Sequence, residues 1–329
     1  MPRIVRFYEN GGPEVLKIEE VDVPPPGPGE ITLQVKALGL NRAESMFRSG
    51  QYVEEPDFPA RLGYEAAGVV SALGSGVTNV AVGDAVSLIP PLSITRWGTY
   101  GEVATVPAAH VVKHPASLSW VEAAAVWMQY VTAWGALVEI AKLGAGDTVI
   151  VTAASSSVGL AAIQIAKSVG ATSIAATRTR AKVDALLAFG ANHVIATDAE
   201  DLPARVREIT GGKGARVAFD PVVGPLFPKL AEALSVEGIL FEYGALSTEP
   251  APFPLFPVLG KMLTVHGYQY KQIVHDAQRL ERAKHFILDG LASGALKPVI
   301  DRTFPLEQIV DAHRYLESNQ QFGKIVVTV

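Results

Sequence analysis

The residues between Asp147 and Gly159 have the types and spacing of a phosphate-binding turn. A β-branched run is followed by small residues, Ala153 to Ser157, and then by an apolar helical pattern. Small residues let the backbone approach a pyrophosphate, and the N–H groups at the start of the helix bind its charge. The usual pattern is Gly-x-Gly-x-x-Gly, of which only the third glycine, Gly159, is present. An ordinary strand-to-helix turn without a ligand is the alternative interpretation.

Two positions of this turn have definite expected roles. Gly159 would allow the helix to pack closely against the strand. Ser156 replaces the glycine nearest the phosphates, and its hydroxyl can donate a hydrogen bond to them. The predicted phosphate-binding residues of the turn are Ser155, Ser156, Ser157, Val158 and Gly159.

The end of the next strand indicates which cofactor is bound. An acidic residue about 20 positions after the turn usually binds the ribose of NAD. This sequence has Thr177, Arg178, Thr179 and Arg180 there and no acid. Two guanidinium groups and two hydroxyls suit a phosphate monoester, which accepts bidentate, charge-assisted hydrogen bonds. We therefore predict a preference for NADPH; the alternative is that Arg180 only begins a solvated helix.

The elements that position these residues alternate between strands and helices after residue 146. We expect strands at 147–152, 172–177, 193–196, 217–219, 239–243 and 263–268, and helices at 158–169, 180–188, 202–210 and 276–293. Such alternation is typical of a doubly wound parallel sheet, an α/β fold. Residues before 120 show short strand patterns separated by proline and glycine turns, which predicts a compact β-rich domain with few helices.

The composition excludes several classes of protein. A chain of 329 residues is long enough for about two domains. A net charge of −5 offers no electrostatic surface for nucleic acid or for an anionic membrane. The absence of cysteine excludes disulfides, thiolate metal sites and a cysteine nucleophile. No stretch has the character of a signal peptide or a membrane span, so we expect a cytoplasmic protein.

Short motifs along the whole chain resemble the zinc-independent medium-chain dehydrogenases/reductases, in the NADPH:quinone oxidoreductase (zeta-crystallin-like) branch. They lie at 11–16 (GGPEVL), 39–41 (GLN), 63–70 (GYEAAGVV), 82–84 (VGD), 154–159 (ASSSVG), 190–191 (GA) and 323–326 (GKIV). The resemblance implies a GroES-like catalytic domain formed by residues 1–122 and 267–329. It also implies a Rossmann domain formed by residues 123–266, with NADPH bound in the cleft.

The zinc-dependent relatives allow a test of metal binding. Their catalytic zinc is held by a cysteine and a histidine at the positions of Asn41 and Tyr64, and by a third ligand further on. Glu65 remains, but one carboxylate does not make a catalytic zinc site, which needs about three protein ligands. We therefore predict that this chain binds no metal.

Without a metal to polarise an alcohol or a carbonyl, hydride must reach a carbon that is already electrophilic. We therefore predict reduction of quinones or α,β-unsaturated carbonyls, in which negative charge develops on an oxygen that neutral donors stabilise. By resemblance, Asn41 and Tyr52 line this site, and Tyr64 is a further candidate. Tyr52 lies where mitochondrial enoyl thioester reductases carry a proton-donating tyrosine, although a packing role is the alternative. A trans-2-enoyl thioester reductase and a non-enzymatic NADPH-binding protein remain alternative functions.

The resemblance also implies cofactor contacts outside the turn. They lie near residue 130, after the fifth and sixth strands and near the C-terminus: Gln129, Tyr130, Thr132, Tyr243, Gly244, Ala245, Leu246, His266, Gly267, Tyr268 and Lys324. Lys324 matches a basic residue that contacts a phosphate. The apolar run 238–243 and the neighbouring proline-rich stretch 250–257 predict a homodimer through edge strands of the nucleotide-binding sheets.

Overall fold

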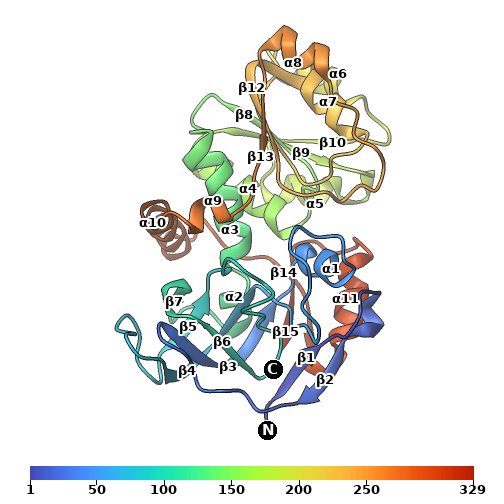
Figure 1. Ribbon diagram of the computed structural model, residues 1–329. Helices are drawn as coiled ribbons and strands as arrows, with labels where there is room; N and C mark the ends of the chain where they lie inside the picture. Colours follow the sequence, from blue (N-terminus) through green and yellow to red (C-terminus); the bar gives the residue numbers. More distant parts are fainter. The chain divides into compact units, whose positions relative to one another are not determined.

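The computed structural model describes residues 1–329 and divides into two compact units, which we call unit 1 and unit 2 (Figure 1). Unit 1 consists of Met1–Met128 and Pro298–Val329, and unit 2 consists of Gln129–Lys297. The first and the last parts of the chain therefore fold together. No helix combines the length and the apolar character that a membrane crossing requires.

A seven-stranded sheet forms the centre of unit 1. Its order is β14-β15-β3-β4-β5-β7, and β6 pairs with β3. The strands are β3 (Glu30–Gly39), β4 (Glu65–Leu73), β5 (Ala85–Leu88), β6 (Val103–Pro107), β7 (Val111–Lys113), β14 (Ile300–Pro305) and β15 (Lys324–Thr328). A separate ribbon pairs β1 (Arg3–Arg6) with β2 (Lys17–Glu20) in antiparallel fashion. The β-rich character of this unit agrees with the prediction.

The helices of unit 1 are short. They are α1 (Arg42–Arg48), α2 (Trp120–Ala123) and α11 (Ile309–Glu317). The side chain of Ser119 accepts a hydrogen bond from the N–H of Glu122 at the start of α2, the capping arrangement that the spacing of these residues predicts. We did not predict α1, because its buried residues include the polar Glu44 and Arg48, which hide the helical hydrophobic period.

Unit 2 contains a six-stranded parallel sheet with the order β10-β9-β8-β11-β12-β13. The strands are β8 (Thr148–Val151), β9 (Thr172–Thr177), β10 (His193–Ala196), β11 (Ala215–Asp220), β12 (Leu234–Glu242) and β13 (Thr264–Gly267). This order confirms the predicted doubly wound Rossmann sheet. The strand order reverses between β8 and β11, and dinucleotides bind at such a point, beyond the carboxyl ends of the strands.

Helices of unit 2 follow most of these strands. They are α3 (Trp127–Trp134), which continues as a π-helix over Gly135–Ile140, and α4 (Ser157–Ser168), α5 (Val183–Phe189), α6 (Leu202–Ile209), α7 (Leu226–Ala233), α8 (Leu255–Lys261), α9 (Lys271–Val274) and α10 (Ala277–Ser293). Leu202 and Val206 of α6 pack with Leu230 of α7 and with the strand residues Ile150 and Ile174 in one apolar cluster. This cluster anchors both helices to the sheet.

The boundaries of the units differ from those that we expected, because α9 and α10 belong to unit 2. Arg279 and Arg282 of α10 form ion pairs with Glu139 at 3.7 and 2.6 Å, and the ring of Phe286 contacts that of Trp134. These contacts tie residues 267–297 to the helix that begins unit 2.

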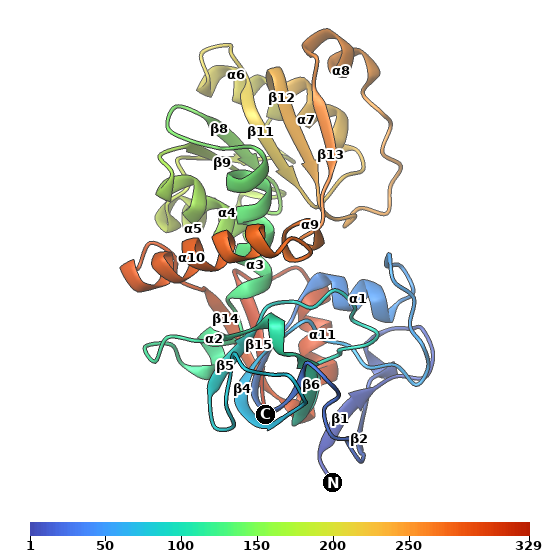
Figure 2. The same ribbon diagram turned by 60° about the vertical axis from the view of Figure 1, so that its left-hand side comes forward.

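The apolar run 238–243 does not lie at a sheet edge, contrary to our expectation. It forms most of β12, which pairs with β11 on one side and with β13 on the other. The two edge strands of this sheet are β10 and β13, and β13 follows α8 in the chain (Figure 2). At this side of the sheet, pairing with a second copy would therefore involve β13 rather than β12.

Candidate active site

The junction between β3 and α1 places Asn41 and Glu44 in unit 1. Asn41 has an extended backbone and precedes the first residue of α1. Its backbone N–H donates a hydrogen bond to Oε2 of Glu44, three residues later, at 2.7 Å. This hydrogen bond is half of a capping box, so the local sequence itself fixes the start of the helix.

The side chain of Asn41 is surrounded by protein groups. Its Nδ2 lies 3.1 Å from the carbonyl oxygen of Gly39, 3.3 Å from Oε1 of Glu44 and 3.2 Å from Oε2 of Glu65, and its Oδ1 accepts from Lys324 Nζ at 2.6 Å. An amide has two N–H hydrogens, and protein acceptors occupy both. This placement differs from the expected role of Asn41 as a donor to a substrate oxygen.

Lys324 begins β15 and is buried against Glu65. The two side chains form an ion pair and are 0% and 1% exposed. The other carboxylate oxygen of Glu65 accepts from the backbone N–H of Met128 at 2.8 Å. We expected Lys324 to contact a phosphate, but its ammonium is bound by Glu65 and Asn41. The difference arises because β15 pairs with β3 and so carries Lys324 into the interior of the unit.

Tyr52 and Tyr64 are brought together by the fold of unit 1. Tyr64 is fully buried just before β4, and its hydroxyl donates to the hydroxyl oxygen of Tyr52 at 3.0 Å. Tyr52 is half-buried, with its ring edge-on to Phe47 of α1. Burial raises the pKa of Tyr52, and the hydrogen bond from Tyr64 acts against this rise. Tyr52 therefore keeps its proton at neutral pH, and its oxygen accepts a hydrogen bond from the Tyr64 hydroxyl.

A further set of buried polar groups is connected to this pair through Glu44, which accepts from the backbone N–H of Tyr64, and it was not predicted from the sequence. The Tyr100 hydroxyl donates to Oε2 of Glu44 at 2.6 Å and lies 3.1 Å from Nε2 of His313. Burial raises the pKa of Glu44 to about 7 and lowers that of His313 to about 3. The three-residue spacing of Asn41 and Glu44 is the one signal in the sequence that pointed to this set.

In unit 2, the turn after β8 has the tight geometry that phosphate binding requires. Ser156 begins α4, and its Oγ accepts from the N–H of Gly159 at 3.1 Å. A Cβ on Gly159 would lie 2.6 Å from the carbonyl oxygen of Ala154, so only glycine allows this close approach. Ser157 and Val158 form the first turn of α4. The hydroxyl hydrogen of Ser156 remains a donor, because its oxygen makes the capping contact.

Positive charge gathers beside this turn. Lys182, which our sequence reasoning missed, donates from Nζ to Oγ of Ser155 at 3.0 Å. Arg178 and Arg180 follow β9 with exposed side chains. Thr179 lies between them, and its side chain accepts from the N–H of Ala181 and so caps the short helix that begins at Arg180.

Two of the predicted cofactor residues, Tyr130 and Tyr268, are buried in unit 2. Tyr130 is 1% exposed and donates to Oε1 of Gln164 at 2.7 Å. Tyr268 is 2% exposed, and its hydroxyl donates to the carbonyl oxygen of Val131 at 3.4 Å. Contact of these two tyrosines with the cofactor stays a prediction.

The remaining predicted cofactor residues lie in α3 or at the carboxyl ends of β12 and β13. Tyr243 stacks on Phe219 with ring centroids 4.0 Å apart, and His266 contacts Gln272 at 3.2 Å. The others are the buried Gln129 and Thr132 of α3, the exposed Ala245 and Leu246, and the two glycines Gly244 and Gly267. The residues after β12 and β13 lie at the carboxyl ends of the strands, which is where dinucleotides bind to such sheets.

Two carboxyl groups also lie at the carboxyl ends of the strands, and the sequence did not predict them. Asp220 ends β11 and accepts hydrogen bonds from the side chain of Thr152 and from the N–H groups of Val222 and Val223. Glu242 is its register partner on β12. Burial and the neighbouring charge of Asp220 raise the pKa of Glu242 to about 9. Glu242 is therefore neutral at pH 7 and adds no negative charge to this end of the sheet.

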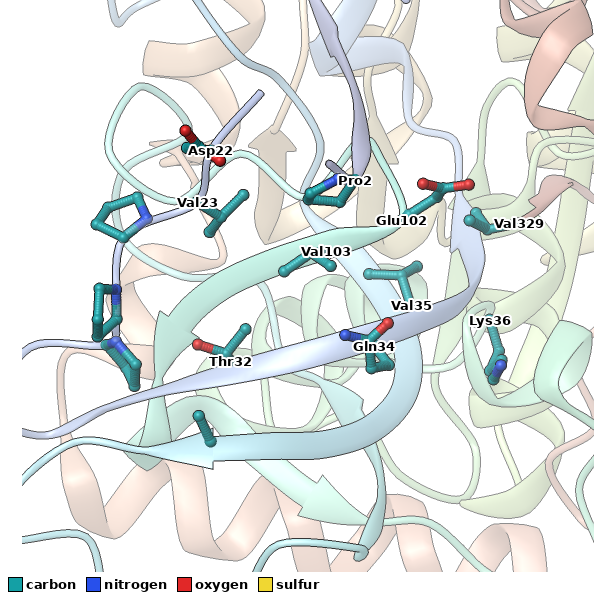
Figure 3. A pocket seen from close by; sticks show the side chains of 14 residues that line it. Pro2, Asp22, Val23, Thr32, Gln34, Val35, Lys36, Glu102, Val103 and Val329 are labelled. Atoms are coloured by element: carbon teal, nitrogen blue, oxygen red, sulfur yellow. The ribbon is translucent and has the colours of Figure 1, made fainter. Parts of the chain in front are cut away.

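A separate cavity in unit 1 has no part in these clusters. It has a volume of about 750 Å³ and lies between the segment Asp22–Pro26 and the strands β3 and β6 (Figure 3). Thr32, Gln34 and Lys36 line it together with Glu102, whose carboxylate is paired with Arg3. Its lining contains none of the predicted site residues.

Comparison with known proteins gives consistent results over the whole chain. Residues 157–284 match the zinc-binding dehydrogenase family model, and residues 27–116 match that of the alcohol dehydrogenase GroES-like domain. The chain is 31% identical to 2-haloacrylate reductase of Burkholderia sp, over 98% of this chain and 97% of that protein. It is 32% identical to quinone oxidoreductase 1 of Escherichia coli K12, over 97% of each. The crystal structure of the Escherichia coli quinone oxidoreductase complexed with NADPH superimposes with a TM-score of 0.91 at 31% identity, covering 99% of this chain and 100% of that one.

Proposed function

Because the chain belongs to the medium-chain dehydrogenase/reductase family, in its quinone oxidoreductase branch, we propose that it is an NADPH-dependent reductase of quinones or α,β-unsaturated carbonyls. The named relatives act on quinones or on 2-haloacrylate, and both kinds of acceptor contain a conjugated, electrophilic carbon. The observation that carries the proposal is the hydrogen bond from Tyr64 to Tyr52, which leaves the Tyr52 proton available to an acceptor.

The groups of unit 2 fit NADPH. The N–H groups at the start of α4 and the hydroxyls of the serine-rich turn suit a pyrophosphate. Lys182, Arg178 and Arg180 supply the positive charge that a 2′-phosphate requires. When bound, NADPH supplies a hydride to the acceptor.

The groups of unit 1 supply the proton. Tyr52 donates its proton to the oxygen on which negative charge develops, so that one hydride and one proton convert a quinone to a hydroquinone. The Tyr64 hydroxyl stabilises the resulting phenolate by donating to its oxygen. Asn41, Glu65 and Lys324 hold the adjoining segments in place through their own hydrogen bonds. This scheme assigns no step to a metal.

An acceptor screen with protein dialysed against EDTA tests the proposed function. We expect NADPH oxidation with a simple quinone, an enone, 2-chloroacrylate or crotonyl-CoA, at a rate that dialysis leaves unchanged. Crotonyl-CoA as the best acceptor would favour the enoyl thioester reductase alternative. NADPH binding without turnover of any acceptor would contradict the proposal and favour a non-enzymatic NADPH-binding protein. Activity that dialysis removes and zinc restores would contradict the metal-free scheme.

We predict that Lys182→Ala combined with Arg178→Ala raises the KM for NADPH by about 10- to 100-fold, because the two charge-assisted interactions, screened by solvent, together contribute about 1.5–3 kcal/mol. The KM for NADH should change little, since NADH lacks the 2′-phosphate. Steady-state kinetics with both cofactors measure the effect. Lys213→Ala, at an exposed lysine before β11, is the matched control. Equal losses for NADPH and NADH would contradict the assignment.

We also propose that the protein is a homodimer formed through unit 2. The edge strand β13 pairs with β12 alone, and an open edge is normally covered or blocked. Beside it in sequence, α8 and its flanks expose apolar side chains with the spacing of one helix face: Leu255, Phe256, Leu259 and Met262, which are 50%, 83%, 64% and 61% exposed. A second copy would cover both features and remove this apolar surface from water.

We predict that Phe256→Glu combined with Leu259→Glu converts the protein to a monomer. Light scattering at micromolar concentration should give twice 34.9 kDa for the wild type and 34.9 kDa for the variant. Leu187→Glu, at a 45% exposed leucine of α5, should leave the dimer intact. A monomeric wild type would contradict the proposal.

A further inference from the structure

The buried carboxyl of Glu44 joins three separate segments of unit 1. Its Oε2 accepts from the N–H of Asn41 at 2.7 Å and from the hydroxyl of Tyr100 at 2.6 Å. Its Oε1 accepts from the N–H of Tyr64 at 2.8 Å and lies 3.3 Å from Nδ2 of Asn41. One side chain therefore fixes the start of α1, the start of β4 and the segment that precedes β6.

The contact with Tyr64 connects Glu44 to the proton donor. Tyr64 uses its backbone N–H to bind Glu44 and its hydroxyl to bind the oxygen of Tyr52 at 3.0 Å. The Tyr64 ring is fully buried, so close packing couples the position of its hydroxyl to that of its main chain. A shift of that main chain would break the contact between the two hydroxyls.

We propose that Glu44 is a positioning residue for proton transfer, because its carboxyl holds the main chain of Tyr64 and so keeps the Tyr64 hydroxyl on the oxygen of Tyr52. The proposal rests on the proposed function, in which Tyr52 donates the proton. A glutamine at position 44 has one acceptor oxygen and an NH₂ group. The NH₂ group would face the N–H of Asn41 or that of Tyr64, and a buried donor without an acceptor costs about 1–3 kcal/mol.

A purely electrostatic role for Glu44 predicts the opposite effect on Tyr52. The groups that act on Tyr52 are the carboxylates of Glu44 and Glu54, which raise its pKa, and the hydroxyl of Tyr64, which lowers it. The groups that act on Glu44 are Tyr100, Asn41, Tyr64 and the ammonium of Lys324. Loss of the Glu44 charge alone would lower the pKa of Tyr52, whereas displacement of Tyr64 would raise it.

Carbon-13 NMR of the full chain, labelled at the ζ carbon of its nine tyrosines, distinguishes the two effects. Tyr52→Phe assigns the Tyr52 resonance. We expect Glu44→Gln to raise the pKa of Tyr52, as Tyr64→Phe does. In a Tyr64→Phe background, Glu44→Gln should lower it instead, because only the charge effect remains.

Glu54→Gln is the matched control. It removes another carboxylate that acts on Tyr52, and it leaves the Tyr64 main chain alone because Glu54 is bound to Ser93 and the N–H of Thr95. We expect this variant to lower the pKa of Tyr52. A fall of similar size in Glu44→Gln would overturn the positioning role.

Kinetics provide the second measurement. Glu44→Gln should lower kcat by about 10- to 100-fold, the scale of a misplaced catalytic group, and leave the KM for NADPH unchanged. The NMR titration requires no turnover, so an inactive wild type would contradict the proposed function and leave the test of Glu44 intact. If Glu44→Gln does not fold, the same titration is carried out on Glu44→Asp. The shorter aspartate side chain keeps the charge but cannot reach all the partners of Glu44. An unchanged or lowered pKa of Tyr52 in that variant would overturn the proposal.

Discussion

The variant Tyr52→Phe is expected to lower kcat for an enone by about 100- to 10,000-fold, the usual contribution of a general acid. Phenylalanine keeps the ring that packs on Phe47 but has no proton to donate. The KM for NADPH should stay within about twofold, because the groups assigned to NADPH belong to unit 2. Steady-state kinetics over a range of pH measure both constants.

Two further tyrosine variants control this result. Tyr64→Phe should cause a smaller loss of kcat, because it removes the donor to Tyr52 and leaves the Tyr52 proton in place. Tyr8→Phe, at a 53% exposed tyrosine that binds Glu19, should leave kcat unchanged. A loss of less than about threefold in Tyr52→Phe would show that water or another group supplies the proton.

The variant Lys324→Met is expected to destabilise unit 1 by about 3–5 kcal/mol. Removing one partner of a buried ion pair leaves the other charge uncompensated, which typically costs this much. The carboxylate of Glu65 and Oδ1 of Asn41 would both lose the ammonium that they now share. The free energy of unfolding, measured by urea denaturation with a probe in unit 1, gives the loss.

Two comparisons test that explanation of the loss. In Lys324→Met/Glu65→Gln the uncompensated charge is absent, so the double variant should be more stable than Lys324→Met alone. Lys113→Met removes a lysine that is 59% exposed and paired with Asp84 at 2.8 Å, and it should cost less than about 1 kcal/mol. Equal losses for Lys324→Met and Lys113→Met would contradict the importance of the buried pair.

Local sequence patterns were enough to predict the parallel sheet of unit 2 and the turn that follows its first strand. The strand at 172–177 is a β-branched and small-residue run, and the helix at 157–168 has an apolar period, so both could be recognised locally. Such patterns arise because a strand buried on both faces and a helix buried on one face each impose a short-range spacing of apolar residues. The glycine at the end of the turn, Gly159, is required by local geometry as well.

The partners of the polar side chains depend on how distant segments of the chain pack together. Lys324 binds Asn41, 283 residues away in the chain, because β15 pairs with β3. The same pairing withdraws Lys324 from the phosphate contact that its motif implied. The Tyr52 and Tyr64 hydroxyls meet across a loop, and Glu44 reaches the main chain of Tyr64, with no periodicity in the sequence to indicate either contact.

The position of β12 inside the sheet was also settled by strand order. Its apolar run suits an interior strand and a covered edge strand equally well, since both are buried on two faces. Local spacing determines which elements form, because it reflects the burial of each element's own faces. Which strands pair, and therefore which side chains meet, depends on contacts between distant parts of the chain, and those contacts positioned the residues to which we assign the chemistry.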